Sequence, residues 1–180
     1  MRKYSLLSVI ITIFLISGCL TYSSVKYEIV FNEDLTGGTV KVTFFDLKST
    51  EADTAKQRKD FLSLVELLFE DDFLLDNIEE GIYIKERDMY VENGKLNVTY
   101  GGIFRSSKLA EKDMRTTENE RILRFDKNKG DVATSNGNVV ETEDSFIFSW
   151  PKDLKNPEFK INRKMEESYS MLDYYNEWKK

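Results

Sequence analysis

The stretch "MYVENGKLNVTY", residues 89–100, contains the strongest fold signal in this chain of 180 residues. At its centre, Asn93-Gly94 is the pair most strongly associated with a two-residue type I′ turn, because both residues tolerate a positive φ. Apolar and polar residues alternate after the turn. The apolar residues on one face of this second arm are Leu96, Val98, Tyr100 and Phe104. The pattern predicts a β-hairpin with arms at 82–91 and 95–104.

Two features on either side of this hairpin extend the sheet. The double glycine at 101 and 102 interrupts the second arm, which indicates a bulge or a close backbone approach. Upstream, two segments of alternating apolar and polar residues flank the turn-rich "NEDLTGG". They predict an earlier antiparallel hairpin with one solvent-exposed face. The apolar residues of these two runs are Val25, Tyr27, Ile29 and Phe31, then Val40, Val42 and Phe44.

Helical spacing appears in three segments. A start signal at Thr50 and Asp53 precedes a predicted helix over 54–69. Its apolar residues are Phe61, Leu62, Val65, Leu68 and Phe69. The stretch "EDDFLLDNIEEG" predicts either a bent continuation of this helix or a second short helix, ending near Gly81. The C-terminal segment 162–178 predicts a third helix, with Met165, Tyr169, Leu172 and Tyr175 on one stripe.

The rest of the chain is predicted to be mostly strand. Residues 105–120 are polar and are interpreted as a short helix and loop. Strand patterns follow at 121–125, 131–134, 139–142 and 145–150, with a tight turn at Asn136-Gly137 and a stop at Pro151. The sequence therefore predicts one α+β domain over 25–180. Its antiparallel sheet is built from hairpins and packs against an amphipathic helix and a C-terminal helix.

The N-terminus has the three-part order of a secretory signal. Arg2 and Lys3 precede an apolar run over 6–16, which is too short to cross a bilayer and ends on small residues. The residues Ile16, Ser17, Gly18 and Cys19 resemble the lipobox of bacterial lipoproteins. An alternative interpretation makes Cys19 an ordinary small residue at the end of an uncleaved membrane segment.

The lipobox resemblance implies removal of residues 1–18 and lipidation of Cys19. Two or more acyl chains give stable anchoring, whereas one gives only marginal binding. The expected organisation is a cleaved signal peptide over 1–18, then the lipidated cysteine and a short polar tether over 19–24. The implied location is the bacterial cell envelope. Leu20 follows the cysteine, which favours the outer membrane if the source has two membranes.

Composition removes several classes of chemistry. The chain has no histidine, and Cys19 is its only cysteine, so histidine triads, histidine metal sites and intrachain disulfides are excluded. Loss of residues 1–18 would change the formal net charge from −6 to −8, because Arg2 and Lys3 leave with the signal. Such a charge disfavours nucleic acid as a partner. We expect no cofactor and no bound metal.

Two acidic stretches invite a chemical interpretation. "DKNKGD", residues 126–131, fails the EF-hand pattern, because its sixth position is Asp131 and its twelfth is Gly137, so a polar turn is predicted. "EDDFLLD", residues 70–76, could bind a divalent cation or supply paired carboxylates for glycoside hydrolysis. The acids in question are Asp71, Asp72 and Asp76. The competing interpretation is a solvated helix face.

Aromatic residues suggest a surface role. Tyr174, Tyr175 and Trp178 suit an interface with a protein or with lipid headgroups, although they could simply cover the domain edge. The leading prediction is a membrane-anchored envelope lipoprotein that binds or scaffolds without catalysis. One alternative is an apolar ligand carrier, and another is a carboxylate-dependent hydrolase. The carrier would need a cavity lined by Phe44, Phe61, Val65, Tyr100 and Phe146.

Overall fold

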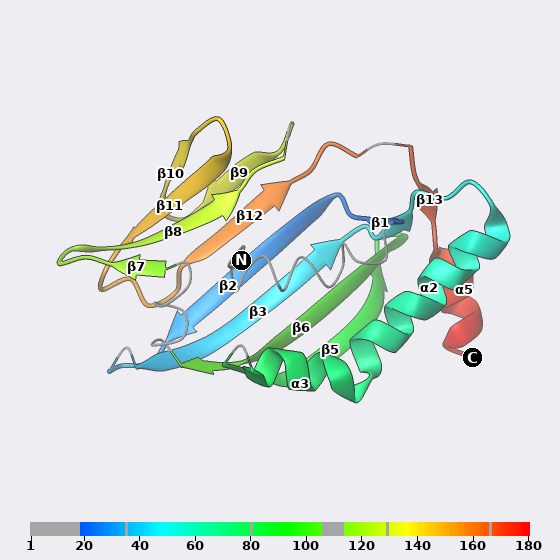
Figure 1. Cartoon of the computed structure of the whole chain (residues 1–180), viewed down its shortest axis with the longest axis horizontal. Helices are drawn as coiled ribbons and strands as arrows, with labels where there is room; N and C mark the ends of the chain where they lie inside the picture. The colour runs from blue at the N-terminus through cyan, green and yellow to red at the C-terminus, as the bar shows by residue number, and fades with distance from the viewer. Residues whose placement is uncertain (1–18, 35, 80, 106–113, 129, 166) are drawn as a thin grey trace.

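The fold is α+β, as predicted, with antiparallel sheets and helices that cover one side of the largest sheet (Figure 1). The computed structural model describes residues 19–34, 36–79, 81–105, 114–128, 130–165 and 167–180. The predicted signal peptide, residues 1–18, lies outside the described residues.

A six-stranded antiparallel sheet forms the centre of the molecule, in the order β5-β6-β3-β2-β12-β9. Its strands are β2 (Ser24–Phe31), β3 (Gly37–Phe45), β5 (Ile82–Glu92), β6 (Lys95–Arg105), β9 (Val132–Ser135) and β12 (Glu158–Asn162). Both predicted hairpins are confirmed, since β2 pairs with β3 and β5 with β6. In the β5–β6 turn, Asn93 has φ 52° and Gly94 φ 71°, as a type I′ turn requires.

One face of this sheet is apolar and buried. Tyr27, Val42 and Tyr100 lie directly opposite one another on β2, β3 and β6, so their side chains share a face. Each is at most 2% exposed. We call this the inner face. The other side, the outer face, carries Lys26 and Lys41 among its polar residues.

A four-stranded sheet covers the β2–β12 part of the inner face. Its order is β10-β11-β8-β7. The strands are β7 (Met114–Thr116), β8 (Glu120–Asp126), β10 (Asn138–Glu141) and β11 (Ser145–Pro151). Phe159 of β12 joins the two sheets, because its ring lies 4.4 Å from that of Phe148 and 4.6 Å, stacked, from that of Tyr27. Burial of these aromatic rings holds the sheets together.

Helices cover the other part of the inner face. They are α2 (Thr54–Phe69), α3 (Asp71–Glu79) and α5 (Leu172–Trp178). Phe73 of α3 meets the ring of Tyr100 edge-on at 5.2 Å, and α5 lies beside α2 (Figure 1). The N-cap of α2 is Asp53, whose carboxylate accepts a hydrogen bond from the Lys56 amide at 2.9 Å. Thr50, the first residue of the predicted start signal, therefore lies outside the helix.

A small third sheet corrects the prediction of a tether after Cys19. Its strands are β1 (Leu20–Thr21), β4 (Lys48–Ser49) and β13 (Tyr169–Ser170), in the order β1-β4-β13. Tyr22 and Ser24, predicted to be part of a polar leash, are only 3% and 4% exposed. The ring of Tyr22 packs edge-on against Phe44 at 4.9 Å. Burial of this aromatic ring outweighs the polar composition of the segment.

The C-terminal helix is much shorter than predicted. Only residues 172–178 are helical, and the start of the predicted helix, Asn162, is the last residue of β12. Tyr169 pairs with β4 in place of lying on a helical stripe. Phe159 and Ile161 alternate as buried residues, and pairing with β2 and β9 keeps the chain extended as far as Asn162. Of the predicted stripe, Leu172 and Tyr175 do lie on α5, whereas Tyr169 pairs with β4.

Residues 105–120 also differ from the prediction of a short helix and loop. Met114–Thr116 form β7, which pairs with β8 because Met114, 4% exposed, completes the inner side of the small sheet. Residues 106–113 lie outside the described residues. The other predicted strands are confirmed to within two residues. Asp131 is a turn residue ahead of β9, and Pro151 is the last residue of β11 and does not follow it.

We predict that Gly102→Ala destabilises the fold and that Gly101→Ala does so far less. A Cβ at Gly102 would lie 2.4 Å from the Tyr83 carbonyl oxygen, which is backbone of the paired strand and cannot move away. A Cβ at Gly101 would first meet the flexible Glu86 side chain, at 2.7 Å. Overpacking typically costs about 1–3 kcal/mol. Urea unfolding midpoints check this, and equal midpoints for the two variants would contradict it.

Candidate functional site

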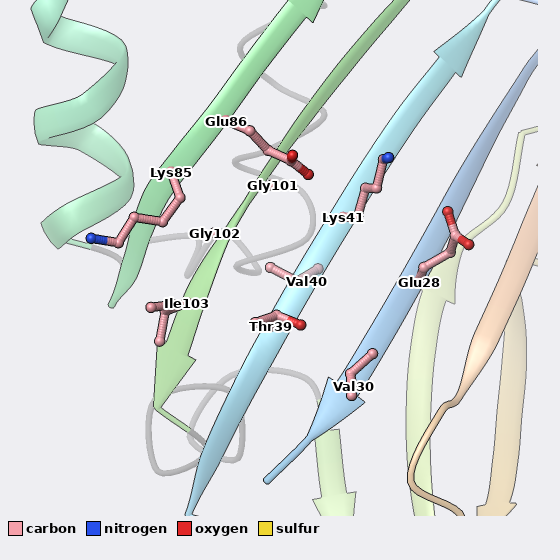
Figure 2. Close-up of a pocket in the computed structure, with 10 residues that line it drawn as sticks. All are labelled: Glu28, Val30, Thr39, Val40, Lys41, Lys85, Glu86, Gly101, Gly102 and Ile103. Carbon is pink, nitrogen blue, oxygen red and sulfur yellow. The ribbon is translucent and has the colours of Figure 1, made fainter.

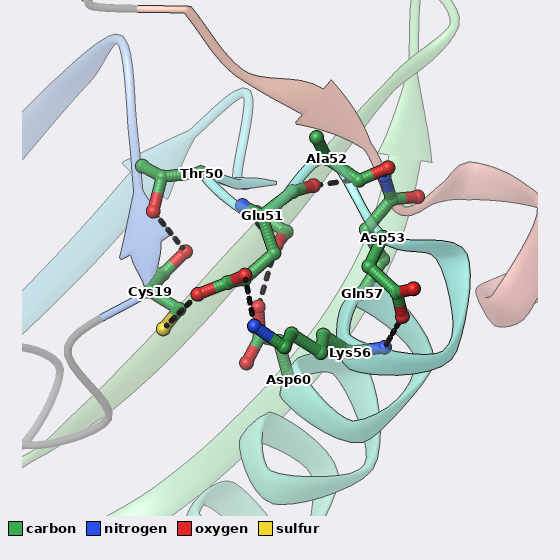
Figure 3. A network of polar contacts seen from close by, with 9 residues as sticks. Cys19, Thr50, Glu51, Ala52, Asp53, Lys56, Gln57 and Asp60 are labelled. Atoms are coloured by element: carbon green, nitrogen blue, oxygen red, sulfur yellow. Dashed lines mark hydrogen bonds and ion pairs between the residues drawn. The ribbon is translucent and has the colours of Figure 1, made fainter.

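The predicted lipidation residue, Cys19, lies immediately before the first strand. Leu20 already belongs to β1, and the Cys19 carbonyl accepts hydrogen bonds from the Thr50 amide at 2.7 Å and the Thr50 hydroxyl at 3.2 Å (Figure 3). The backbone of Cys19 is therefore fixed against the loop between β4 and α2. Any group attached to this sulfur would be held directly at the domain surface.

The thiol of Cys19 is held in its protonated form. Its Sγ donates to the Glu51 carboxylate at 3.1 Å, and Glu51 also pairs with Lys56 at 3.3 Å (Figure 3). The hydrogen bond to Glu51, assisted by burial, raises the pKa of the Cys19 thiol. Because a reactive cysteine needs a lowered pKa, this environment does not prepare a thiolate nucleophile.

The loop around Cys19 is held by polar contacts that reach into α2. Ser49 donates to the Asp60 carboxylate at 2.5 Å and accepts from the Glu51 amide at 3.0 Å. Gln57 donates to the Glu51 carbonyl at 2.9 Å. Ser49 is fully buried, and Asp60 is 8% exposed. Cys19 thus sits at a hydrogen-bonded junction between β4 and the first turns of α2.

An apolar surface lies farther along the same helix. We call it the helical patch, and it consists of Leu62, Phe69 and Trp178, which are 52%, 37% and 41% exposed. The rings of Phe69 and Trp178 stack at 5.8 Å. A hollow of about 210 Å³ lies beside Trp178, and its rim carries the Arg58–Glu177 ion pair at 3.0 Å.

The structure separates the three aromatic residues predicted to form an interface. Trp178 is exposed and belongs to the helical patch, whereas Tyr175 is 8% exposed and donates its hydroxyl to the Met89 carbonyl at 3.1 Å. Tyr174 is half-buried, and its hydroxyl donates to the Thr54 carbonyl at 3.1 Å. Two of the three therefore attach α5 to the domain, and only Trp178 offers a large free surface.

A second hollow, of about 390 Å³, lies on the outer face of the six-stranded sheet (Figure 2). The double glycine forms the floor of this hollow, because Gly101 has no side chain to fill it. Gly101 pairs with Glu86, next to the bulge between Ile84 and Glu86. The predicted bulge is confirmed. Figure 2 shows Glu28, Lys41 and Glu86 around this floor. Charges of both signs give the hollow no preference for an anion or a cation.

The acids proposed for hydrolysis or cation binding are all exposed. Asp71 and Asp72 lie in the first turn of α3, where the helix dipole favours negative charge, and Asp76 lies one turn later. No group of three or more acids or cysteines that could hold a metal ion occurs in the described part of the chain. The hydrolase remains a prediction.

The residues proposed to line a carrier cavity lie in different parts of the core. Phe44 and Tyr100 stack at 6.3 Å on the inner face, whereas Phe61 of α2 meets Tyr174 and Trp178 of α5. Val65 is partly buried against the core, and Phe146 lies on β11 beside Phe148. The carrier also remains a prediction, and these five residues do not form its wall together.

The remaining acidic stretch is a turn, as predicted. The Asp131 amide donates to the Asn128 carbonyl at 3.1 Å, and the Asn128 amide donates to the Asp131 carboxylate at 3.1 Å. Asp131 is 4% exposed, however, and sequence patterns gave no sign that this carboxylate is buried.

In comparisons with known proteins, no family model, no curated protein and no solved structure matches this chain. Within the described residues, none of the helices has the length and apolar character needed to cross a membrane.

We predict that loss of the thiol raises the pKa of Glu51. The hydrogen bond from Cys19 is the largest cause of its lowered pKa, and the ion pair with Lys56 is the next. In Cys19→Ala the first cause disappears and the second stays, so the pKa should rise but remain below its ordinary value. A carboxyl-carbon NMR titration of Glu51 measures this. An unchanged pKa of Glu51 would show that the Cys19 Sγ hydrogen bond does not lower it.

Proposed function

We propose that this chain is a bacterial envelope lipoprotein whose domain is held directly against the membrane through lipidated Cys19. The observation that carries the proposal is the position of Cys19, one residue before β1 and hydrogen-bonded to Thr50. The lipobox resemblance of residues 16–19 supports lipidation. The fixed backbone at Cys19 supports a domain without a spacer, because Leu20 to Ser24 are packed into the fold.

The helical patch gives the anchored domain an orientation. Lys56, in the first turn of α2, pairs with the Glu51 that binds Cys19, and Leu62 lies six residues farther along the helix. Six residues correspond to about 9 Å along a helix axis. Leu62, the nearest member of the patch, therefore lies close to Cys19 along α2, and Figure 1 places β1, α2 and α5 on the same side of the molecule. Trp side chains favour the membrane–water interface, so we expect this side to face the lipid.

The proposed role is binding or scaffolding at the membrane and not catalysis. Histidine is absent from the sequence, and lipidation of Cys19 would use the only thiol. If the source has two membranes, Leu20 favours the outer one, as the sequence predicts. A domain attached to the membrane through Cys19 would bind molecules that reach the membrane surface.

Intact mass tests the anchor. We expect the protein extracted from membranes to lack residues 1–18 and to carry acyl chains on Cys19. Cys19→Ser should remove the acyl mass and release the domain from the membrane fraction. Ser49→Thr, a nearby change that keeps a hydroxyl, should leave the acyl mass in place. A full-length, unmodified mass for the unaltered chain would overturn the proposal.

Tryptophan quenching tests the orientation. The chain has two tryptophans, and Trp150 is fully buried whereas Trp178 is 41% exposed. In vesicles with brominated phospholipid, we expect quenching of the anchored protein that Trp178→Phe abolishes. The remaining Trp150 then serves as an internal control, since it should stay unquenched. Equal quenching with and without Trp178 would place a different face against the membrane.

A further inference from the structure

Five polar side chains meet under the inner face of the six-stranded sheet. We call them the inner polar cluster, and they are Tyr22, Tyr27, Tyr100, Asp131 and Arg163. They come from five segments: the residues before β2, then β2 and β6, the turn before β9 and the residue after β12. The three tyrosines and Asp131 are each at most 4% exposed.

Contacts connect the members of this cluster. The guanidinium of Arg163 lies 4.6 Å from the centre of the Tyr22 ring, and its Nε is 3.6 Å from Asp131 Oδ1. Tyr27 and Tyr100 lie in one cross-strand row, separated only by Val42. Burial raises the pKa of Tyr27 well above its ordinary value, and the neighbouring phenols of Tyr100 and Tyr22 raise it further. The phenols are therefore close enough to sense one another and stay neutral.

Each member has one buried polar atom without a hydrogen-bond partner among the described residues. Two of these atoms, Arg163 Nε and Asp131 Oδ1, face each other as an ion pair at 3.6 Å, so the three tyrosine hydroxyls are the members that lack any polar partner there. Six such side-chain atoms occur in the described part of the chain, and five belong to this cluster. The sixth belongs to Arg121, whose guanidinium lies 3.9 Å from the centre of the Phe31 ring. The large majority of buried side-chain polar atoms are normally paired, and each unpaired one is costly. Their concentration in one place needs an explanation.

Packing alone does not explain the tyrosines. Phenylalanine would fill the same space without a hydroxyl, and this core already uses it widely, with twelve in the chain. Tyr27, for example, stacks on Phe159 through its ring. Three hydroxyls that turn inward without a partner therefore point to a group that is bound there and completes their hydrogen bonds.

The chemistry of the cluster selects the kind of group. The charges of Arg163 and Asp131 cancel, so the site offers no net attraction to an anion or a cation. Phenol hydroxyls both donate and accept, Arg163 Nε donates and Asp131 Oδ1 accepts. The complementary ligand carries several donors and acceptors and no charge. Arg163, whose side chain is 15% exposed, is the member that reaches the surface and marks the approach.

We propose that the inner polar cluster binds an uncharged, hydroxyl-rich group, such as a sugar or glycerol unit. This inference deepens the binding role proposed above by naming the ligand class. It rests on the cluster alone and not on lipidation. If the intact-mass test showed no lipidation, the proposed ligand site would be unaffected. If the cluster bound no sugar, the proposed lipidation of Cys19 would be unaffected.

The test compares three probes against the full-length protein in phosphatidylcholine nanodiscs, with binding followed by NMR of labelled tyrosines. The probes are n-octyl β-D-glucoside below its micelle concentration, D-glucose and sodium octanoate. We expect saturable binding of the glucoside and none of octanoate, which has a charged head on a similar chain. If glucose also binds, a free sugar is enough to fill the site. If the glucoside binds and glucose does not, the ligand is a lipid with a sugar headgroup. Octanoate binding as tightly as the glucoside, or no sugar binding at all, would overturn the proposal.

Paired variants connect binding to the cluster. Tyr27→Phe with Tyr100→Phe should weaken glucoside binding at least tenfold. Tyr90→Phe on β5 should leave it unchanged, because Tyr90 lies opposite Asn97 on the outer face. The double variant should keep or raise the thermal midpoint, since it removes unpaired hydroxyls, so misfolding would not account for lost binding. Unchanged binding in the double variant would also overturn the proposal.

Discussion

The inner face of the six-stranded sheet must be kept from water, and the rest of the structure is arranged by that constraint. No single element covers the whole face. Helices α2 and α3 cover the β5–β6 part through residues such as Phe73, and the four-stranded sheet covers the β2–β12 part through Phe125 and Phe148. On the inner face, Tyr100 contacts α3 and Phe159 contacts the four-stranded sheet. Because burial of aromatic area is a large favourable contribution, these contacts fix where both covers sit.

The same constraint explains why the N-terminal end of the described domain is rigid. Tyr22 reaches the inner face through Phe44, and this draws Leu20 and Thr21 into pairing with β4. Cys19 is thereby brought against Thr50 and Glu51 at the start of α2. Cys19 thereby becomes part of a polar junction at the start of α2. This junction and the helical patch are both carried by α2.

The inner polar cluster is the exception to the apolar character of this face. The rings of its tyrosines pack in the core, as the contacts of Tyr22 with Phe44 and of Tyr27 with Phe159 show, whereas their hydroxyls are buried without a hydrogen-bond partner among the described residues. A core built only for stability would use phenylalanine at these positions. Proteins commonly accept such local costs at sites where something binds. The cluster is therefore a separate region from the junction at Cys19, and we propose recognition for the first and membrane attachment for the second.

The sequence by itself determined the features that depend on neighbouring residues. The Asn93-Gly94 turn, the alternating arms of both hairpins, the helix over 54–69 and the lipobox resemblance at Cys19 all follow from short-range patterns, since turn geometry and burial period are local properties. Only the tertiary structure decided what distant segments do together. It limited the predicted helix at 162–178 to residues 172–178, because β2 and β9 pair with the chain up to Asn162 and β4 pairs with Tyr169 and Ser170. It also packed the expected tether through Tyr22. Finally, it brought together Tyr27 of β2, Tyr100 of β6 and Arg163, the residue after β12. Such contacts depend on the fold of the whole chain, and no local pattern encodes them.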